Sequence, residues 1–167
     1  MWLLSRLVVR TRAGQKSTPM MDDPFDLSRY VDVQEGSFEA ALAEISRGSK
    51  RGHWMWYIFP QIKGLGRSEM ARHYAIASLD EARAYLAHPL LGKRLSTCVE
   101  ALQDLPGTSA ADVFGDIDAT KLRSSLTLFW QAGGGATFEA ALTRWFGSPD
   151  PLTMDVIGYD NPIRPDV

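Results

Sequence analysis

The side chains best suited to chemistry gather in one segment of this chain, residues 50–68. Its nineteen positions hold four aromatic residues, four basic residues, one histidine and one glutamine, together with glycines. A segment that only filled a core would not need the polar groups, and a segment that only formed a loop would not need the aromatic ones. Apolar surface with a few placed hydrogen-bonding groups is typical of the wall of a ligand pocket. The sequence therefore predicts a binding site here.

The end of this segment has the residue types of an anion-binding loop. Its glycines at positions 64 and 66 permit a tight turn, and the serine at 68 suits the N-cap of a helix that continues through Tyr74. Free backbone N–H groups at a helix start, flanked by a lysine and an arginine, attract anions. The spacing is neither that of the P-loop nor that of the dinucleotide-binding fingerprint, so the alternative stays open that the glycines serve only the turn. The residues expected to contact an anion are Lys63, Gly64, Gly66, Arg67 and Ser68.

The start of the segment supplies an apolar wall and a candidate acid or base. Trp54, Trp56 and Phe59 are expected to pack or stack against a ligand, and the Gln61 amide is expected to orient it. His53 is a candidate general acid or base, because histidine titrates near neutral pH. The alternative is a structural histidine that holds a backbone carbonyl.

A second polar cluster follows at residues 115–121. Asp116 is the candidate catalytic partner of the histidine, and Lys121 is expected to add a second positive charge to the site. Asp116 and Asp118 are spaced to hold a divalent ion, but Asp118 suits a helix N-cap and no further carboxylates complete a calcium loop. The three histidines also lack paired metal spacing. No metal and no cofactor are therefore predicted. Ser125, on a core-facing stripe, is expected to bond a carbonyl one turn back.

The composition predicts one ordinary folded domain. A chain of 167 residues with 45% hydrophobic and 23% charged residues is expected to bury a single core. Cys98 is the only cysteine, which excludes an internal disulfide and fits a cytoplasmic location. Oligomeric state is left open by these features.

The charge is spread unevenly along the chain. Residues 1–20 hold four of the 18 basic residues and no acidic one, which leaves 14 basic against all 20 acidic residues in the rest. An acidic body gains nothing from the phosphate attraction that drives general nucleic-acid binding. No run of about 18 apolar residues occurs, so no membrane span is predicted.

Residues 1–20 are predicted to lie outside the folded domain, as a disordered extension or an overlong start. An Arg-rich, acid-free start is also typical of an organelle transit peptide, but a working protein that begins at Met20 or Met21 is the favoured interpretation. The helical domain is then expected over residues 21–158. Residues 159–167 are expected to form a C-terminal tail.

The body of the chain predicts a mainly α fold, a compact single-domain bundle of short helices. Apolar residues recur with helical period between capping residues and glycines, and residues 91–102 carry one clear apolar stripe. Residues 53–59 suit a buried strand as well as a helical turn. The predicted N-caps are Ser37, Asp80, Ser109, Asp118 and Thr137, and the predicted stops are Gly48, Gly115, Gly133–Gly135 and Gly147.

Three motifs carry a resemblance to a known family. The stretches HWMWYIFPQIKGLGRS at 53–68, EARAYLAHPLLG at 81–92 and FGDIDATKLRSSLTLF at 114–129 resemble the proteins of the domain of unknown function 1810 family. The resemblance covers about residues 22–157 and implies a mainly helical, bacterial, cytoplasmic domain with no established activity. Some members are labelled calpastatin-like, but nothing in this sequence resembles a disordered inhibitor repeat.

The residues favour a site for a small phosphate-bearing or nucleotide-like ligand, which the protein is expected to bind or hydrolyse. Helical hydrolases of ADP-ribose-type compounds offer a loose analogy. The alternative is a non-catalytic interaction module that docks a protein partner through the aromatic segment 53–59. The two differ in where the tryptophans lie, in a concave pocket or on an exposed flat patch.

Overall fold

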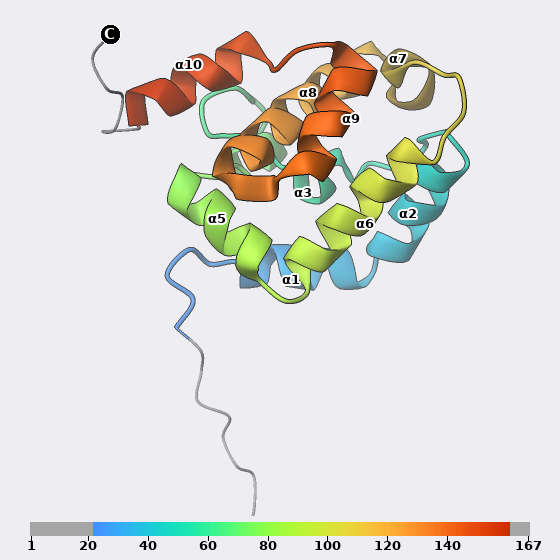
Figure 1. The fold of residues 1–167 in the computed structure, drawn as a ribbon. Coiled ribbons are helices and arrows are strands. Elements are labelled where there is room, and N and C mark those ends of the chain that lie inside the picture. Colours follow the sequence, from blue (N-terminus) through green and yellow to red (C-terminus); the bar gives the residue numbers. More distant parts are fainter. Residues whose placement is uncertain (1–21, 161–167) are drawn as a thin grey trace, which may run out of the picture.

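The computed structural model describes residues 22–160, which form a compact domain built from helices (Figure 1). Within this range no strand is present, so the predicted mainly α fold is confirmed. The predicted N-terminal extension over 1–20, and the tail from 161 onward, lie outside the described residues. The helices are α1 (Ser28–Glu35), α2 (Phe38–Ser46), α3 (Met55–Ile58), α4 (Glu69–His73), α5 (Leu79–Ala87), α6 (Leu91–Gln103), α7 (Ala110–Phe114), α8 (Asp116–Phe129), the π-helical turn η1 (Trp130–Gly134), α9 (Ala136–Phe146) and α10 (Pro151–Asp160).

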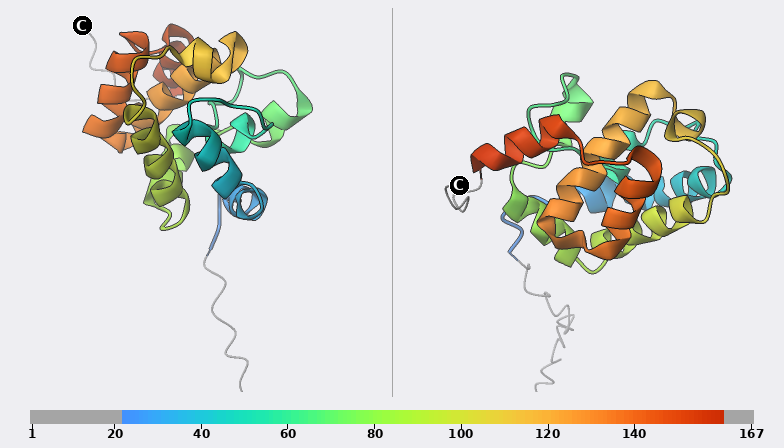
Figure 2. Two further views of the ribbon diagram at one scale, coloured as in Figure 1. Left: turned by 90° about the vertical axis from the view of Figure 1, so that its right-hand side faces the viewer. Right: turned by 45° about the horizontal axis from the view of Figure 1, so that its top comes forward.

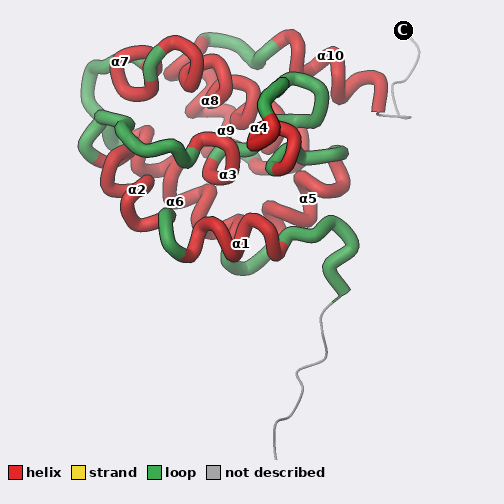
Figure 3. The backbone as a smooth tube through the Cα atoms, turned by 180° about the vertical axis from the view of Figure 1, so that it is seen from behind, coloured by secondary structure: helices red, strands yellow, loops and turns green. Residues whose placement is uncertain are grey.

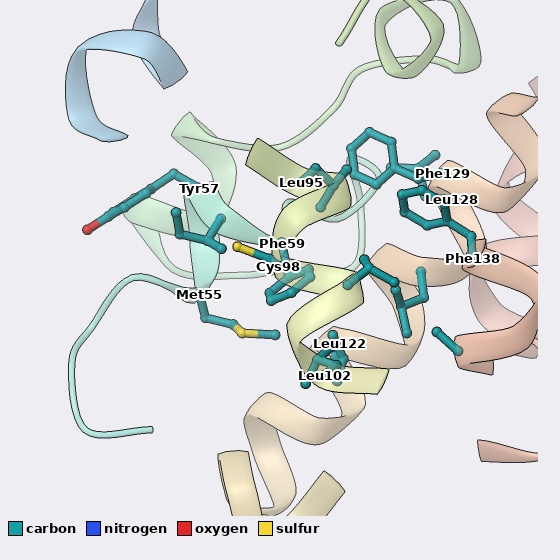
Figure 4. Close-up of a cluster of buried hydrophobic side chains, with 14 of the residues drawn as sticks. Met55, Tyr57, Phe59, Leu95, Cys98, Leu102, Leu122, Leu128, Phe129 and Phe138 are labelled. Atoms are coloured by element: carbon teal, nitrogen blue, oxygen red, sulfur yellow. The ribbon is translucent and has the colours of Figure 1, made fainter. Parts of the chain in front are cut away.

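The core is centred on α6 and α8, which the other helices surround. The apolar stripe predicted over residues 91–102 is confirmed, because its side chains are all buried, namely those of Leu91, Leu95, Cys98, Val99 and Leu102. Figure 4 shows α6 presenting Leu95, Cys98 and Leu102 between the side chains of α3 on one side and those of α8 and α9 on the other. Helices at a core face bury such a stripe because removing apolar surface from water is the main favourable term in folding.

The aromatic segment forms one helical turn, α3, rather than a strand. Trp54, Tyr57 and Phe59 are buried together with Met55, whereas Trp56 is only half-buried. The following loop returns on itself, since the Lys63 N–H donates to the Ile76 carbonyl at 2.8 Å. Helix α4 lies inside this loop, on the same face of the molecule as α3 (Figure 3).

Several predicted helix ends are confirmed. Ser109 caps α7 through a reciprocal capping box with Asp112, and Ser68 caps α4 by accepting the Ala71 N–H. Gly147 ends α9 in the left-handed conformation at a φ of 75°.

Other predicted caps are wrong, because these polar residues lie inside the first helical turn. Helix α8 begins at Asp116 rather than after Asp118, α9 begins at Ala136 rather than after Thr137, and α5 begins before Asp80. Ser78 caps α5 instead, accepting the Glu81 N–H at 3.1 Å. Ser37 occupies the cap position of α2, but its hydroxyl donates to the Val33 carbonyl and leaves the helix start uncapped.

Helix α10 packs against α8 (Figure 2). A buried cluster of hydroxyl groups links the two helices. The Thr153 hydroxyl donates to Asp150 Oδ2 at 2.5 Å and lies 2.8 Å from Ser124 Oγ. Helix α10 runs to Asp160, past the predicted domain end at 158. Ser125 is fully buried on α8 as predicted, but its hydroxyl makes no hydrogen bond to the preceding turn.

Helices α5 and α6 meet where only a glycine fits. A Cβ atom added at Gly92 would lie 2.0 Å from the Leu86 carbonyl oxygen, so any larger residue would force the two helices apart. This close crossing fixes the angle at which α6 enters the core.

Candidate functional site

Two adjoining spaces between α3, α4 and α8 form one hollow. They share four lining residues, Gln61, Gly66, Ala71 and Lys121. The outer space is open and has a volume of about 430 Å³, within the range of small-molecule sites. The inner space, under the side chain of Trp56, has room for only about 10 Å³. We call the two spaces together the Trp56–Lys121 hollow, with an inner pocket and an outer space.

Two segments far apart in the sequence build this hollow. Helix α3 supplies Trp56, the loop closed by the Ile62–Ile76 bridge supplies Gln61, Arg67 and Ser68, and α8 supplies Lys121. The loop comes close to α4 because Gly66 has no side chain, since a Cβ atom there would lie 2.4 Å from the Ala71 Cβ. The predicted contributions of Trp56, Gln61, Gly66, Arg67, Ser68 and Lys121 are therefore brought together.

A cation lies over the aromatic wall. The Lys121 Nζ is 5.5 Å from the centroid of the Trp56 ring, within the range of a cation–π contact. The same Nζ is 3.6 Å from Asp118 Oδ1, but Asp118 also binds the Lys50 ammonium more closely, at 2.8 Å through Oδ2. One carboxylate thus serves two ammonium groups, and the cluster keeps a net positive charge.

No acidic side chain lines the hollow. Its lining includes the basic groups of Lys121 and Arg67, and Arg67 is exposed with no ion pair or hydrogen-bond partner within residues 22–160. The ring of Tyr74 borders the inner pocket, and burial raises the pKa of its phenol, so the hydroxyl is neutral near pH 7. The charged side chains that line the hollow are therefore all basic.

One hydrogen-bond donor in the wall has no acceptor. The Trp56 Nε1 atom is shielded from solvent, and no described group accepts from it. An indole N–H is a donor only, and a buried donor without an acceptor costs about 1–3 kcal/mol.

Two of the predicted wall residues belong to the core instead. Trp54 is 3% exposed and packs edge-on against Phe114, with its indole N–H donated to Glu44 Oε2 at 2.8 Å. Its polar atom is thus already satisfied, and its side chain lines neither the inner pocket nor the outer space. Phe59 is 1% exposed and reaches only the floor of the inner pocket.

The predicted catalytic pair is not at the hollow. His53 is exposed before α3. Asp116 is exposed in the first turn of α8, where it borders a neighbouring open depression that shares Ile117 with the outer space. Neither side chain lines the inner pocket or the outer space. The hollow therefore has no imidazole or carboxylate to act as general acid or base.

Two predicted anion contacts also lie elsewhere. Lys63 and Gly64 are exposed, and neither lines the inner pocket or the outer space. Gly64 has a φ of 104° and serves the turn. Ser68 lies on the rim, with its hydroxyl accepting the Ala71 N–H. No group of three or more metal-binding side chains occurs among the residues described.

Sequence reasoning missed several residues of the site. Ile117, which is 74% exposed, and Thr120 line the outer space beside Lys121. Their place on α8 follows once the helix is known to begin at Asp116, because positions 117 and 121 are one turn apart. The Lys50–Asp118 ion pair, which belongs to the cluster with Lys121, could not be predicted from neighbouring residues in the sequence, since its two residues are brought together only by tertiary packing.

Thiol chemistry has no support in the structure. Cys98 is a free cysteine inside the core, and burial raises the pKa of its thiol to about 12. A buried thiol of this kind behaves as a small apolar side chain.

The fold and the site together define an all-helical domain with an open hollow that combines an aromatic wall with basic groups. Residues 24–157 match the family model described as "Protein of unknown function (DUF1810)", and the chain belongs to this family. It is similar to a protein of known structure, the conserved hypothetical protein Rv1873 from Mycobacterium tuberculosis. That protein is 43% identical, with a TM-score of 0.80, and the match covers 81% of this chain and 99% of the other. A search of the curated proteins finds no match.

Over residues 22–160, no helix combines the length and the apolar character needed to cross a bilayer.

Proposed function

We propose that this protein binds a small anionic molecule that carries a flat ring, such as a mononucleotide, in the Trp56–Lys121 hollow. The observation that carries the proposal is the convergence of Trp56, Gln61, Arg67 and Lys121 on one space whose lining includes no acidic residue. An aromatic wall suits a ring, and two basic groups at the opening suit a phosphate.

The size of the hollow supports a ligand of this class. The outer space of about 430 Å³ is within the range of roughly 300–1,000 Å³ that small-molecule sites occupy, which is enough for a mononucleotide. Arg67 at the rim is free to form a bidentate contact with phosphate oxygens, a geometry that guanidinium groups favour.

The proposal is for binding rather than hydrolysis. Proton transfer needs an acid or base within about 3 Å of the reacting group, and neither His53 nor Asp116 lines the hollow. The protein-docking alternative has less support, because most aromatic side chains of the segment 53–59 face the core instead of solvent.

The test is a calorimetric titration with inosine 5′-monophosphate (IMP) and with ADP-ribose. We expect saturable binding that weakens about tenfold or more in Lys121→Met and in Arg67→Ala, since each removes a charge-assisted contact. Lys63→Ala is the matched control. It removes an exposed cation of the same loop that lies outside the hollow, and it is expected to leave the affinity unchanged.

Two results would contradict the proposal. One is the absence of binding to IMP, AMP, ADP-ribose and pyrophosphate alike. The other is binding that is weakened by Lys63→Ala but not by Lys121→Met, a result that would place the anion at Lys63, outside the hollow.

We also propose a cytoplasmic location in a bacterial cell. A nucleotide-like ligand is available there, and the free, buried Cys98 needs no oxidising compartment. Fractionation of cells that produce the full chain tests this location, and recovery in a secreted or membrane fraction would contradict it.

A further inference from the structure

A second space, mostly apolar, lies between α1 and α5. It has a volume of about 520 Å³ and is lined by the turn that leads into α1, by α1 itself and by the end of α5 (Figure 3). Phe25, Leu27 and Val31 form one wall, and Ala84 and Ala87 form the other. None of its described lining residues belongs to the Trp56–Lys121 hollow. We call this space the α1–α5 groove.

Polar contacts hold both walls of the groove in place. The Arg29 guanidinium lies 2.7 Å from Glu81 Oε1, which fixes α1 against α5. The two carboxylate oxygens of Asp23 accept the N–H groups of Leu27 at 2.8 Å and of Ser28 at 3.0 Å, which fixes the turn before α1. Because these contacts set the distance between the walls, the groove is not expected to close on itself. A fixed apolar surface of this kind is typical of an interaction site.

The charged side chains of the groove are acidic. Asp22 and Asp23 line it and are exposed, and no lysine or arginine occurs among its described lining residues. Burial acts to raise the pKa of Asp23, but the N–H groups of Ser28 and Leu27 lower it, so this carboxylate is ionised near pH 7. His88 also lines the groove, and its Nδ1 accepts backbone N–H groups as in a neutral imidazole. The groove therefore suits an occupant that is apolar and basic.

The chain that precedes the groove has this composition. Residues 1–20 hold four basic residues and no acidic one. Within them, residues 2–10 combine two arginines with six apolar residues, which are Trp2, Leu3, Leu4, Leu7, Val8 and Val9.

The connection between this segment and the groove is short. Residues 11–21 separate the segment from Asp22 at the edge of the groove, and such a length of chain spans at most roughly 35 Å. A segment tethered over this distance has an effective concentration on the order of millimolar, so a weak contact is enough to keep it bound.

We propose that residues 2–10 bind in the α1–α5 groove of the same chain, with Arg6 and Arg10 beside the carboxylates of Asp22 and Asp23. The apolar side chains of the segment then cover the walls of α1 and α5. This interaction goes beyond the proposed function and does not depend on the Trp56–Lys121 hollow. Residues 1–20 then belong to the working protein, contrary to the favoured interpretation of an overlong start.

The test uses the full chain with a nitroxide label in the segment. Ser5→Cys supplies the attachment point, and the label does not react with Cys98, which is buried with a thiol pKa raised to about 12. In a ¹H–¹⁵N correlation spectrum we expect the amide signals of Val31 and Ala87 to lose most of their intensity to the label. The signal of Ala111 is expected to keep its intensity, because α7 lies at the opposite end of the domain (Figures 1 and 3).

Substitutions in the segment test the apolar contact without changing the folded domain. Leu3→Asn combined with Leu7→Asn is expected to restore the signals of Val31 and Ala87, since it removes apolar surface from the segment. The matched control is Thr11→Asn combined with Ala13→Asn. It places two asparagines in the connection instead, and the loss of signal is expected to remain.

Two results would overturn the inference. One is full intensity for Val31 and Ala87 in the labelled chain, or a loss that the Leu3→Asn and Leu7→Asn pair does not reduce, either of which leaves the groove to another partner. The other comes from mixing labelled ¹⁴N protein with unlabelled ¹⁵N protein. A loss of the groove signals in that mixture would show that the segment binds a second copy of the chain.

Discussion

Two regions of this molecule combine basic side chains with aromatic rings, and they differ in whether the polar atoms are satisfied. In the first, the Arg29 guanidinium donates to Glu81 Oε1 at 2.7 Å, to Tyr30 Oη and to backbone carbonyls that include those of Phe25 and Ala75. In the second, the Trp56–Lys121 hollow, Arg67 has no partner among residues 22–160 and the Trp56 indole N–H has no acceptor.

The difference separates structural from ligand-binding use of the same residue types. A buried polar group is tolerated in a folded protein when its hydrogen bonds are made, and satisfied groups contribute to one unique packing. Arg29 and its partners hold α1 against α5, so they leave nothing for a ligand. Groups that stay unsatisfied in a hollow are available for binding, and they are expected to affect affinity more than stability.

The largest effect is expected from a substitution that breaks the satisfied Arg29 cluster. Arg29→Met leaves the Glu81 carboxylate buried without its cation, and the free energy of unfolding is expected to fall by about 3–5 kcal/mol. Urea denaturation at pH 7 measures the loss. Arg83→Met is the control, because the Arg83–Asp80 pair is exposed and is expected to contribute less than about 0.5 kcal/mol. Equal losses of stability from the two substitutions would contradict the claim that the satisfied Arg29 cluster stabilises the fold more than an exposed ion pair does.

A second buried cluster tests whether satisfied hydroxyls behave in the same way. Thr153→Val removes the hydroxyl that links Asp150 to Ser124. It leaves the Ser124 hydroxyl without a partner at the α8–α10 contact, and Asp150 Oδ2 with only the Thr153 N–H as donor. We expect a loss of about 1–3 kcal/mol in the same assay. In the control, Thr143→Val, the lost hydrogen bond is exposed on α9, and the expected change is small. A neutral Thr153→Val would show that α10 is held by apolar packing alone.

Asp118 takes part both in a buried ion pair and in the hollow, since it pairs with the buried Lys50 and with Lys121 of the hollow. Asp118→Asn removes both pairings. We expect a loss of about 1–2 kcal/mol in stability from the unpaired Lys50, together with tighter IMP binding because Lys121 is no longer shared. Calorimetry and denaturation on the same variant measure both. Weaker IMP binding would mean that Asp118 holds Lys121 in place instead of competing for its charge.

The smallest expected effect concerns pH. Burial acts to raise the pKa of Glu44, but the hydrogen bonds from the Arg51 and Gly52 N–H groups and the Trp54 indole together lower it below the ordinary 4.5. The unfolded chain then binds the proton more tightly. The stabilisation is therefore present above pH 4.5 and is lost as the pH falls below that value.

Glu44→Gln is expected to reduce the loss of stability between pH 5 and pH 3, by less than about 1 kcal/mol, because the carboxylate is only partly buried and solvent screens its interactions. Thermal denaturation across this range measures the difference. Glu100→Gln, at an exposed position of α6, is the control and is expected to leave the pH profile unchanged. Identical profiles for the wild-type protein and Glu44→Gln would exclude this contribution.

Local features of the sequence predicted the helices well. The apolar stripe of α6 and the capping box at Ser109 depend only on residues a few positions apart, and both are present. The wrong caps have a local cause too. Asp80, Asp118 and Thr137 are good capping residues, but they also fit the first turn of a helix that begins earlier.

The candidate site was harder to predict, because its parts meet only in the tertiary structure. Trp54 and Trp56 are two positions apart in one helical turn, so they point in directions that differ by about 200°. Nothing in the sequence says which of them faces the core. The same holds for Lys63 and Lys121. Both are basic, but Lys63 is exposed outside the hollow, whereas the packing of α8 brings Lys121 into it.

The most direct test of the account is the indole N–H signal of Trp56 in a ¹H–¹⁵N correlation spectrum during titration with IMP. The chain has five tryptophans, and Trp56→Phe and Trp54→Phe assign the two signals that matter. We predict that the Trp56 signal moves and saturates with the ligand, while the Trp54 signal, fixed by its hydrogen bond to Glu44, stays in place. A Trp56 signal that does not move while IMP binds, or the same small shift at both indoles, would contradict the assignment of the hollow as the ligand site.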